Sequence, residues 1–324
     1  MVNELDAAYA SCEHAARSHY ENFPVASLLV PASMRRHVAA LYAFARAADD
    51  FADEGARSPQ ERQRLLDGWS ARLDGAAGAP AAGPAPRPGE PSNAVEIFLA
   101  LGATIRDKRL PVALFEDLLS AFGQDVVVTR YRRWDDVLDY SRRSANPVGR
   151  LVLRIAGYDD PRLDGWSDAI CSALQLTNFW QDLKVDFDRG RIYLPADEIQ
   201  QHGADERDLA TGRLTRAWSM ALGSAVERTR TLFLAGRPLC GAVAGRLKYE
   251  LRATWLGGMR VLSRIERADF DVVARRPRLG PTDLPWLAWK LATWAEPTPR
   301  RARARDTAPG EAEPHARRSR AEPR

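Results

Sequence analysis

The sequence predicts an all-α protein, because helical periodicity dominates it and the patterns of other fold classes are missing. Apolar residues recur at spacings of three and four residues through most of the chain. Alternating β-branched residues occur only in two short stretches, DVVVTRY at 125–131 and GRIYLP at 190–195. The sequence has no repeating strand–helix pattern, no GxGxxG and no GxxxxGK, which argues against a doubly wound sheet with a nucleotide site.

The expected helices follow one another along the chain, each assigned where apolar residues recur every three or four positions. They cover residues 5–20, 33–55, 58–74, 93–106, 111–123, 134–143, 146–156, 164–186, 205–234, 239–267 and 283–294. The two β-branched stretches are expected to be short strands, and Pro195 closes the second because proline lacks a backbone N–H.

One domain is expected to hold these helices, with a loop inserted in it and a tail after it. Residues 75–91, GAAGAPAAGPAPRPGEP, are too poor in large apolar residues to join a core, so they should form a flexible surface loop. A linker between domains is the alternative, but the segment before it is too polar at key points to form a separate core. We therefore expect one helical domain at 1–298 and a disordered Arg-rich tail at 299–324.

The basic charge of the chain does not indicate nucleic-acid binding. The isoelectric point is about 9.1 and the net charge is +4, but eight Arg and four acidic residues place that charge within 300–324. The rest of the chain is close to neutral, so nucleic acid is not an expected partner. Weak contact with anionic lipid is the alternative to a tail without function.

The sequence predicts a cytoplasmic location. No stretch approaches the roughly 18 apolar residues that span a bilayer, and the N-terminus contains acidic residues and no apolar core of a signal peptide. The cysteines Cys12, Cys171 and Cys240 are scattered without a CxxC, so neither disulfides nor zinc are indicated. The stretch WLAWKLATW at 286–294 is expected to pack on the domain, with peripheral contact at the inner face of a membrane as the alternative.

An acidic pair interrupts the otherwise apolar helix expected at 33–55. In its segment LYAFARAADDFADEG, Asp49 and Asp53 are four residues apart and therefore share one helical face, with Arg46 one turn before them. Like charges at this spacing destabilise a helix slightly, and burying them unpaired costs far more. The two carboxylates can therefore stay charged only if they contact water or a neutralising cation.

A second acidic pair lies in QLTNFWQDLKVD at 175–186. On a continuous helix, Gln175, Asn178, Asp182 and Asp186 form one polar stripe roughly 80° wide. A stripe that faces water is the alternative for this helix alone. Two such pairs, each on an apolar helix, instead indicate a shared site.

The residue types in the two stripes predict a magnesium site. The candidate ligands carry only oxygen donors, which suit Mg²⁺ and not Zn²⁺; they are Asp49, Asp53, Asn178, Asp182 and Asp186. Proteins bind Mg²⁺ through few carboxylates together with substrate phosphate oxygens. The pattern therefore predicts a phosphate or diphosphate ligand, and the apolar helices around it suit a hydrophobic remainder of that ligand.

These motifs resemble those of the head-to-head trans-prenyltransferases, the squalene and phytoene synthases. The resemblance covers roughly residues 15–270 and is densest in YAFARAADDFAD, in NPVG at 146–149 and in QLTNFWQDLKVDFDRGRIYLP. It implies an all-α isoprenoid-synthase fold around a central cavity, with the four aspartates as Mg²⁺-binding catalytic residues at its mouth. By the same resemblance, Tyr42, Arg46 and Gln175 contact substrate, and Arg191 and Tyr193 lie at the diphosphate end.

One segment departs from the pattern of many relatives, which carry a His-Ser-Lys-Ser-Phe-like sequence that holds a diphosphate. Here HYENFPVAS at 19–27 keeps His19 but has Tyr20, Glu21 and Asn22 in place of the hydroxyl and ammonium groups. A carboxylate there repels a second diphosphate. The segment looks like the hydroxysqualene synthase branch, and this likeness implies that these four residues bind presqualene diphosphate. Sequence drift in a loop is the alternative.

The resemblance implies that the bound substrate ionises and that water captures the rearranged cation. Aromatic faces stabilise such a cation, and Tyr42, Phe23, Phe179 and Tyr249 are the candidates. A condensing synthase that makes squalene, dehydrosqualene or phytoene from two prenyl diphosphates is one alternative. A non-catalytic helical isoprenoid-binding protein is another. Partner enzymes that pass on the intermediate would fit the first hypothesis.

Overall fold

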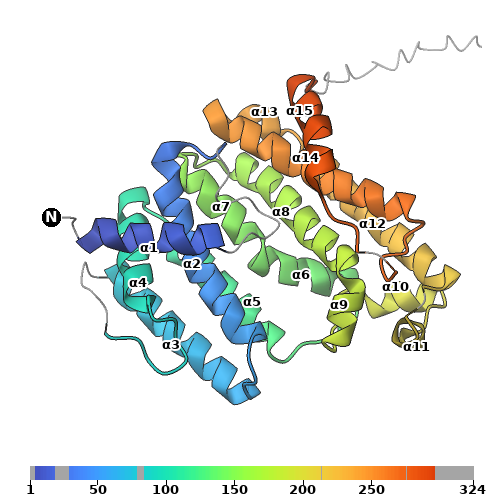
Figure 1. The fold of residues 1–324 in the computed structure, drawn as a ribbon, viewed down its shortest axis with the longest axis horizontal. Helices are drawn as coiled ribbons and strands as arrows, with labels where there is room; N and C mark the ends of the chain where they lie inside the picture. The colour runs from blue at the N-terminus through green and yellow to red at the C-terminus, as the bar shows by residue number, and fades with distance from the viewer. Residues whose placement is uncertain (1–3, 19–28, 79–83, 213, 275, 296–324) are drawn as a thin grey trace, which may run out of the picture. The chain divides into compact units, whose positions relative to one another are not determined.

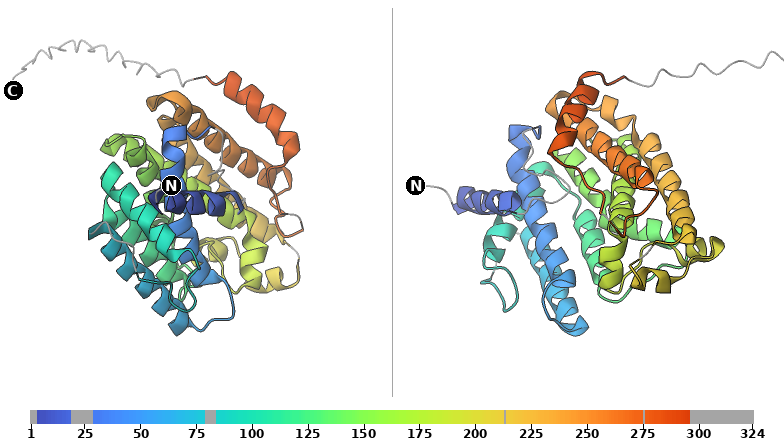
Figure 2. Two further views of the ribbon diagram at one scale, coloured as in Figure 1. Left: turned by 60° about the vertical axis from the view of Figure 1, so that its left-hand side comes forward. Right: turned by 45° about the vertical axis from the view of Figure 1, so that its right-hand side comes forward.

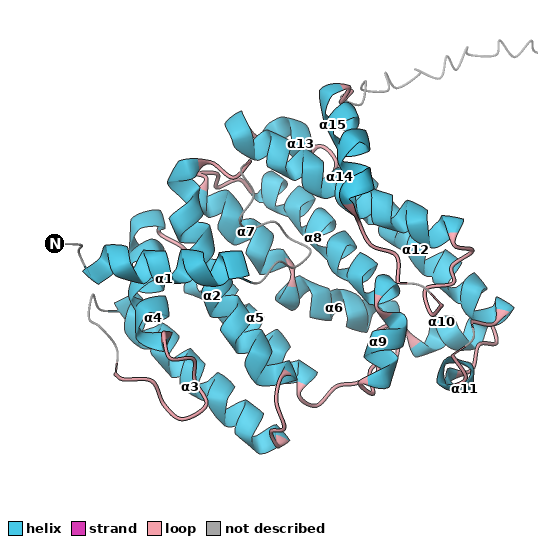
Figure 3. Ribbon diagram, viewed as in Figure 1, coloured by secondary structure: helices cyan, strands magenta, loops and turns pink. Residues whose placement is uncertain are grey.

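The computed structural model describes residues 4–18, 29–78, 84–212, 214–274 and 276–295, and within them it contains helices and no β-strand (Figures 1 and 3). The all-α prediction is confirmed. The elements are α1 Glu4–Ser18, α2 Ala32–Asp53, α3 Pro59–Gly78, α4 Ala94–Lys108, α5 Val112–Asp125, α6 Trp134–Ser144, α7 Asn146–Ile155, α8 Pro161–Gln181, α9 Leu183–Asp188, α10 Ala196–Gln201, α11 Glu206–Ala210, α12 Arg216–Gly236, α13 Leu239–Ala242, α14 Gly245–Arg267, the 3₁₀ turn η1 Pro281–Asp283 and α15 Leu284–Ala292.

The two predicted strands are wrong. In the described chain the only β-type pairing between the stretches 125–131 and 190–195 is an isolated parallel bridge between Arg130 and Ile192. The N–H of Ile192 donates to the carbonyl of Thr129 at 3.0 Å, and the N–H of Ala196 donates to the carbonyl of Tyr131 at 2.9 Å. No ladder forms between these two described stretches, because α10 begins directly after Pro195.

Several predicted helices are divided in the structure. The segment 205–234 forms α11 and α12, because the chain turns at Gly212, which adopts a φ of 70°. The segment 239–267 forms α13 and α14, with Gly245 at a φ of 63° where α14 begins. Periodicity of apolar residues continues across such turns, so the sequence pattern alone did not reveal them.

The Ala/Pro/Gly segment at 75–91 begins inside a helix, since α3 continues to Gly78. Residues 79–83 lie outside the described residues. At the far end, the carboxylate of Glu90 accepts from Arg72 Nη2 at 2.7 Å, and both side chains are almost fully buried. This ion pair fixes the end of the segment to α3. The predicted flexibility of its middle stays a prediction, as do the domain limits, although one compact unit covers Met1–Thr293.

The core orients α2 so that one of its faces is free for a site. Phe44 is fully buried and stacks on Trp69 of α3, with ring centroids 6.1 Å apart. Burying each such ring stabilises the fold by roughly 1.5–3 kcal/mol. Because Phe44, Ala48 and Phe51 take the core side, the acidic side of α2 turns away from α3. On the other side of the site, α8 runs between α7 and α12 and packs against both (Figures 1 and 2).

Candidate active site

A cavity of about 280 Å³ lies between α2, α6, α7, α8, α13 and α14. Its walls are mainly aliphatic, with contributions from Val38 and Leu41 of α2, Val152 of α7 and Leu251 of α14. Polar side chains mark one end, where Tyr42 and Asn178 line the cavity one turn before Arg46 and Asp182 on their helices. The cavity is therefore apolar inside and has its polar groups near the two acidic motifs. We call that polar end the mouth.

The first half of the mouth is the C-terminal end of α2, which is continuous through both aspartates. Arg46 Nη1 lies 3.4 Å from Asp49 Oδ2, and Arg46 Nη2 lies 2.8 Å from Asp50 Oδ1. Asp53 follows one turn after Asp49 at the end of the helix. This half thus holds both aspartates of the predicted pair, Asp49 and Asp53, with the Arg46 guanidinium beside them.

The second half is interrupted, which the sequence did not indicate. Helix α8 ends at Gln181, and Asp182 caps it with φ −103° and ψ 10° before α9 begins. Backbone bonds still cross the break, because Asp182 N–H donates to Asn178 O at 2.9 Å and Asp186 N–H donates to Asp182 O at 2.8 Å. The continuous helix expected at 164–186 is wrong, but the polar residues remain successive along one path.

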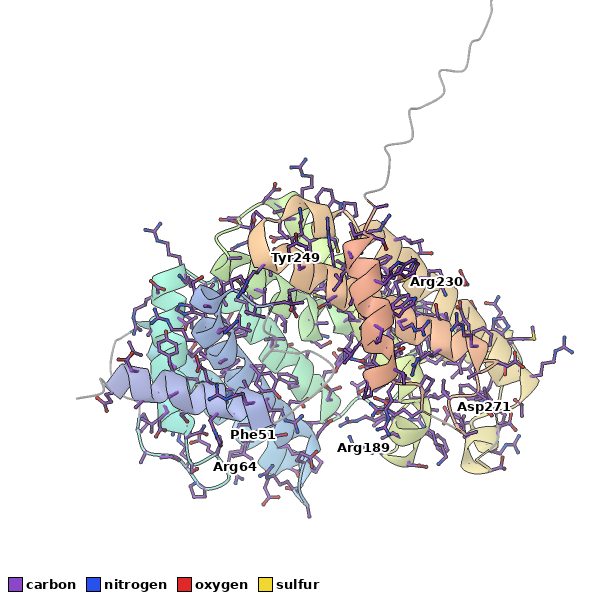
Figure 4. The ribbon with its side chains drawn as sticks, turned by 45° about the horizontal axis from the view of Figure 1, so that its top comes forward. Phe51, Arg64, Arg189, Arg230, Tyr249 and Asp271 are labelled. Carbon is purple, nitrogen blue, oxygen red and sulfur yellow. The ribbon has the colours of Figure 1, made fainter. Side chains whose placement is uncertain are left out.

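Arg191 connects the two halves. The chain turns back after α9 at Gly190, whose φ of 83° favours glycine, and Arg191 N–H donates to Asp186 O at 2.8 Å. Its side chain then reaches α2, where Nη2 lies 2.8 Å from Asp53 Oδ1. Figure 4 shows the preceding residue Arg189 at the same turn. A cation of the second motif therefore contacts an acid of the first, as expected if both motifs form one site.

A second arginine approaches the mouth from the segment after α14. Arg276 Nη2 donates to Asp182 Oδ2 at 2.8 Å, and its Nε contacts Asp182 Oδ1. The Arg276 side chain is 42% exposed. The sequence did not indicate this residue, because the Arg-rich stretch 275–278 carries no spacing that points to a site.

Asp125 and Tyr140 also belong to the mouth and were missed. Tyr140 donates its hydroxyl to Asp125 Oδ2 at 2.6 Å, and Arg191 Nη2 donates to the carbonyl of Asp125 at 3.1 Å. The ring of Tyr193 lies beside Tyr140 and stacks on Phe179 at a centroid distance of 3.7 Å. Asp125 was hidden because its β-branched neighbours indicated a strand. No spacing rule linked Tyr140 to either acidic motif.

Burial, and then repulsion between carboxylates, raises the pKa of three acidic groups of the mouth. Burial raises the pKa of Asp49 to about 7, and repulsion from Asp53 is the second cause. The Asp49 side chain is 41% exposed, but the surrounding protein still displaces much of the water that would stabilise its charge. Burial likewise raises the pKa of Asp125 to about 7, with Asp53 adding to it. Burial and then Asp182 raise the pKa of Asp186 to about 7. The mouth accumulates more negative charge than its arginines neutralise.

This charge fits divalent cations bound together with an anionic ligand. Among the described residues, no three His, Cys, Asp or Glu side chains converge closely enough to hold a metal ion by themselves. Guanidinium groups lie against Asp53 and Asp182 instead. The donors are carboxylate and amide oxygens, the set that Mg²⁺ prefers, and diphosphate oxygens would have to complete the coordination. The predicted ligands are therefore chemically suitable but not assembled on their own.

The structure brings together five of the ten predicted substrate-binding residues. Tyr42 and Gln175 line the cavity, and Arg46, Arg191 and Tyr193 surround its mouth. The predictions for His19, Tyr20, Glu21 and Asn22, together with Phe23, lie outside the described residues.

Tyr249 is a correction. Its side chain is 47% exposed on α14 (Figure 4), and it does not line the cavity. Leu247, Glu250 and Thr254 occupy the face of α14 that turns inward. A helix advances 100° per residue, so Tyr249 points away from that face. Its assignment as an aromatic residue of the cavity is wrong.

Comparisons with known proteins point to one family. The family model for squalene/phytoene synthase matches residues 16–283. A hydroxysqualene synthase of Sinorhizobium fredii is 32% identical over 89% of this chain and 92% of that protein. A hydroxysqualene synthase of Zymomonas mobilis is 37% identical over 65% and 67%, respectively. The crystal structure of the squalene synthase HpnC from Alicyclobacillus acidocaldarius has a TM-score of 0.73 and 38% identity, covering 82% of this chain and 96% of that one.

Proposed function

Since the chain belongs to the squalene/phytoene synthase family, whose members are diphosphate-processing isoprenoid synthases, we propose that it is a hydroxysqualene synthase. The substrate would be presqualene diphosphate, and the products would be hydroxysqualene and diphosphate. The observation that carries the choice of branch is the identity of 32% and 37% to two relatives named hydroxysqualene synthase. The charged mouth on an apolar cavity suits a substrate with a charged head and a hydrocarbon body.

The mouth residues would bind and orient the diphosphate. We infer that Asp49, Asp53, Asn178, Asp182 and Asp186 would hold Mg²⁺, which would supply positive charge to stabilise the leaving diphosphate. Arg191 and Arg46 donate charge-assisted hydrogen bonds to phosphate oxygens and thereby hold the leaving group at the mouth. Arg276 would also donate a hydrogen bond to a phosphate oxygen after its contact with Asp182 breaks. Each of these contacts strengthens as negative charge develops on the departing group.

The aromatic residues next to the mouth would stabilise the carbon that loses the diphosphate. Phe179 and Tyr193 are stacked and buried, and Tyr140 lies at their edge with its ring centroid 5.9 Å from that of Tyr193. Their π faces favour a nearby positive charge. The aliphatic walls beyond them exclude water from the rest of the cation, which limits premature capture.

A condensing synthase that uses two prenyl diphosphates is the second candidate, since HpnC of A. acidocaldarius is called a squalene synthase. Incubation of the purified chain with Mg²⁺ and either presqualene or farnesyl diphosphate separates the two. We expect an alcohol from presqualene diphosphate and no turnover of farnesyl diphosphate alone. Adding a condensing enzyme that makes presqualene diphosphate should then restore product from farnesyl diphosphate. Turnover of farnesyl diphosphate by this chain alone would contradict the assignment.

We also propose that the protein is cytoplasmic and contacts the inner membrane face peripherally. The described part of the chain contains no helix that is long and apolar enough to cross a bilayer. Helix α15 supports a peripheral contact, because Leu284 and Trp289 are 63% and 57% exposed and Lys290 lies beside them. Trp289→Ala should reduce co-sedimentation with anionic vesicles. Equal sedimentation of both proteins would argue against this contact.

A further inference from the structure

We propose that Ser144 positions the water molecule that captures the carbocation. This inference rests on the proposed hydroxysqualene synthase function, which requires water at one carbon of a cation held in an otherwise apolar cavity. The residue is the last one of α6, and its side chain lines the cavity. Ser144 would therefore be a positioning residue that decides between an alcohol and a hydrocarbon product.

The Ser144 hydroxyl has an unused capacity for hydrogen bonding. Its Oγ is shielded from solvent and has no hydrogen-bond partner among the residues that the structure describes. Buried hydroxyl groups are nearly always satisfied by protein or water, so an unsatisfied one needs an explanation. Because the hydroxyl has no partner among the described residues, its rotation about χ1 toward the cavity breaks no hydrogen bond with them. A serine hydroxyl can both donate to and accept from a water molecule.

The position of Ser144 along the cavity matches the reacting carbon. Ser144 follows Tyr140 by one turn of α6, and Tyr140 is bound to Asp125 in the mouth. On the facing helix α8, Gln175 lies one turn inward from Asn178, and both line the cavity. Beyond this level the walls contain Val148 and other aliphatic side chains. Ser144 thus lies where the cavity changes from polar to apolar, next to where the carbon released from diphosphate would be.

Other polar groups on the cavity wall are less suited to this role. Ser167 hydrogen-bonds to the buried Cys171, and both press on Gly149, where an added Cβ would lie 2.3 Å from Ser167 Oγ. Glu250 and Asn178 each have an interaction partner. A carboxylate such as Glu250 would also accept a proton from the cation and so favour elimination. A neutral hydroxyl orients water without removing that proton.

The proposed step balances with water as the only co-reactant. Ser144 Oγ accepts a hydrogen bond from one O–H of the water and thereby directs an oxygen lone pair at the cationic carbon. The new C–O bond forms from that lone pair, and the resulting oxonium gives its extra proton to an oxygen of the released diphosphate. Without an oriented water, the cation instead loses a proton from an adjacent carbon to the same diphosphate and becomes an alkene.

The test compares product ratios with diphosphate release in single variants. Ser144→Ala and Ser144→Val should lower the ratio of alcohol to hydrocarbon about tenfold or more, while diphosphate release stays within about twofold of the parent. Ser144→Thr has the shape of Ser144→Val but keeps the hydroxyl, so it should retain the alcohol. Ser141→Ala is the matched control, because Ser141 Oγ is also buried without a hydrogen-bond partner in the described part of the chain but does not line the cavity.

The outcomes separate this proposal from the proposed function. If the parent protein makes no alcohol from presqualene diphosphate, the function itself is wrong, and this is known before any variant is compared. If the parent makes alcohol and Ser144→Ala keeps the same product ratio, only the role of Ser144 is overturned. A loss of alcohol that is equal in Ser144→Val and Ser144→Thr would also overturn it, since shape and not the hydroxyl would then control capture.

Discussion

The mouth and the interior of the cavity differ in almost every physical property. The mouth gathers aspartates from α2 and from the junction of α8 and α9, with Arg46, Arg191 and Arg276 between them. The interior is lined mainly by aliphatic side chains of the five helices α2, α7, α8, α13 and α14, with fewer polar groups. Charge therefore concentrates where the diphosphate would bind, and a low-polarity space follows directly behind it.

This difference suggests a division of tasks between the two regions. Changes in the mouth should alter how fast diphosphate leaves, because its charges act on the leaving group. Changes in the interior should alter what becomes of the hydrocarbon, because its walls contact only that part. Substitutions in each region can break or sharpen this division.

The largest effect is expected from Asp182→Ala in the mouth. Loss of this carboxylate removes a candidate metal ligand, and diphosphate release should fall about 10³-fold. The rate of diphosphate release is measured with a phosphate-coupled assay. Asp188→Ala is the control, because Asp188 is an exposed acid on the following helix α9 that pairs only with Lys184 among its described neighbours. Unchanged release in Asp182→Ala would contradict the metal-binding role of the mouth.

A smaller loss is expected from Arg191→Lys. Lysine keeps the charge but loses the planar guanidinium, whose Nη2 contacts both Asp53 Oδ1 and the Asp125 carbonyl and whose other N–H groups would donate to phosphate oxygens, so kcat should fall about 10²-fold. Steady-state kinetics against Arg189→Lys provide the comparison, since Arg189 lies two residues earlier and is exposed. Equal activity of the two variants would mean that Arg191 serves only to join the helices.

Filling the interior should affect substrate affinity and leave the mouth intact. Val152→Trp adds bulk to the aliphatic wall, and overpacking of this size should raise the Kd for a non-ionisable prenyl diphosphate analogue about tenfold. Affinity for inorganic diphosphate with Mg²⁺ should stay the same, as calorimetry can show. Val127→Trp controls for the added indole, because Val127 is 72% exposed. Equal loss of affinity for both ligands would argue against the division.

The smallest effect concerns the stability of the metal-free protein. The folded state raises the pKa of Asp125 from 3.8 to about 7, so its contribution is most favourable below pH 3.8 and is lost as the pH rises to about 7. Asp125→Asn removes this titration and should reduce the Tm difference between pH 5.5 and pH 8 by about 4 °C. Calorimetric scans at both pH values test it, with Asp188→Asn as control. An unchanged difference would mean that Asp125 is not the acid that titrates there.

The sequence predicted the fold class and the two acidic motifs because both depend on local spacing. Asp49 and Asp53 lie on one continuous helix, as their four-residue spacing indicated. Membership of the family was also visible in contiguous motifs. The break at Asp182 was not visible in the sequence, since apolar periodicity continues across it. Only the backbone geometry reveals the change from α8 to α9.

The missed residues depend on contacts between distant segments. Tyr140 meets Asp125 across 15 residues, and Arg276 meets Asp182 across 94. No local pattern encodes such pairs. Asp125 was assigned to a strand because its neighbours are β-branched, but a partner ladder never forms. Tyr249 was assigned to the cavity from its aromatic ring alone, and the rotation of α14 places it at the surface.

One labelling measurement tests the account most directly. The purified chain is incubated with Mg²⁺ and presqualene diphosphate in water enriched in ¹⁸O, and released diphosphate is quantified beside the organic product by mass spectrometry. We predict an alcohol that carries the label from water, formed in equal amount to diphosphate. A hydrocarbon as the main product, or diphosphate released without any labelled alcohol, would contradict the claim that the mouth ionises this substrate and the interior lets water capture it.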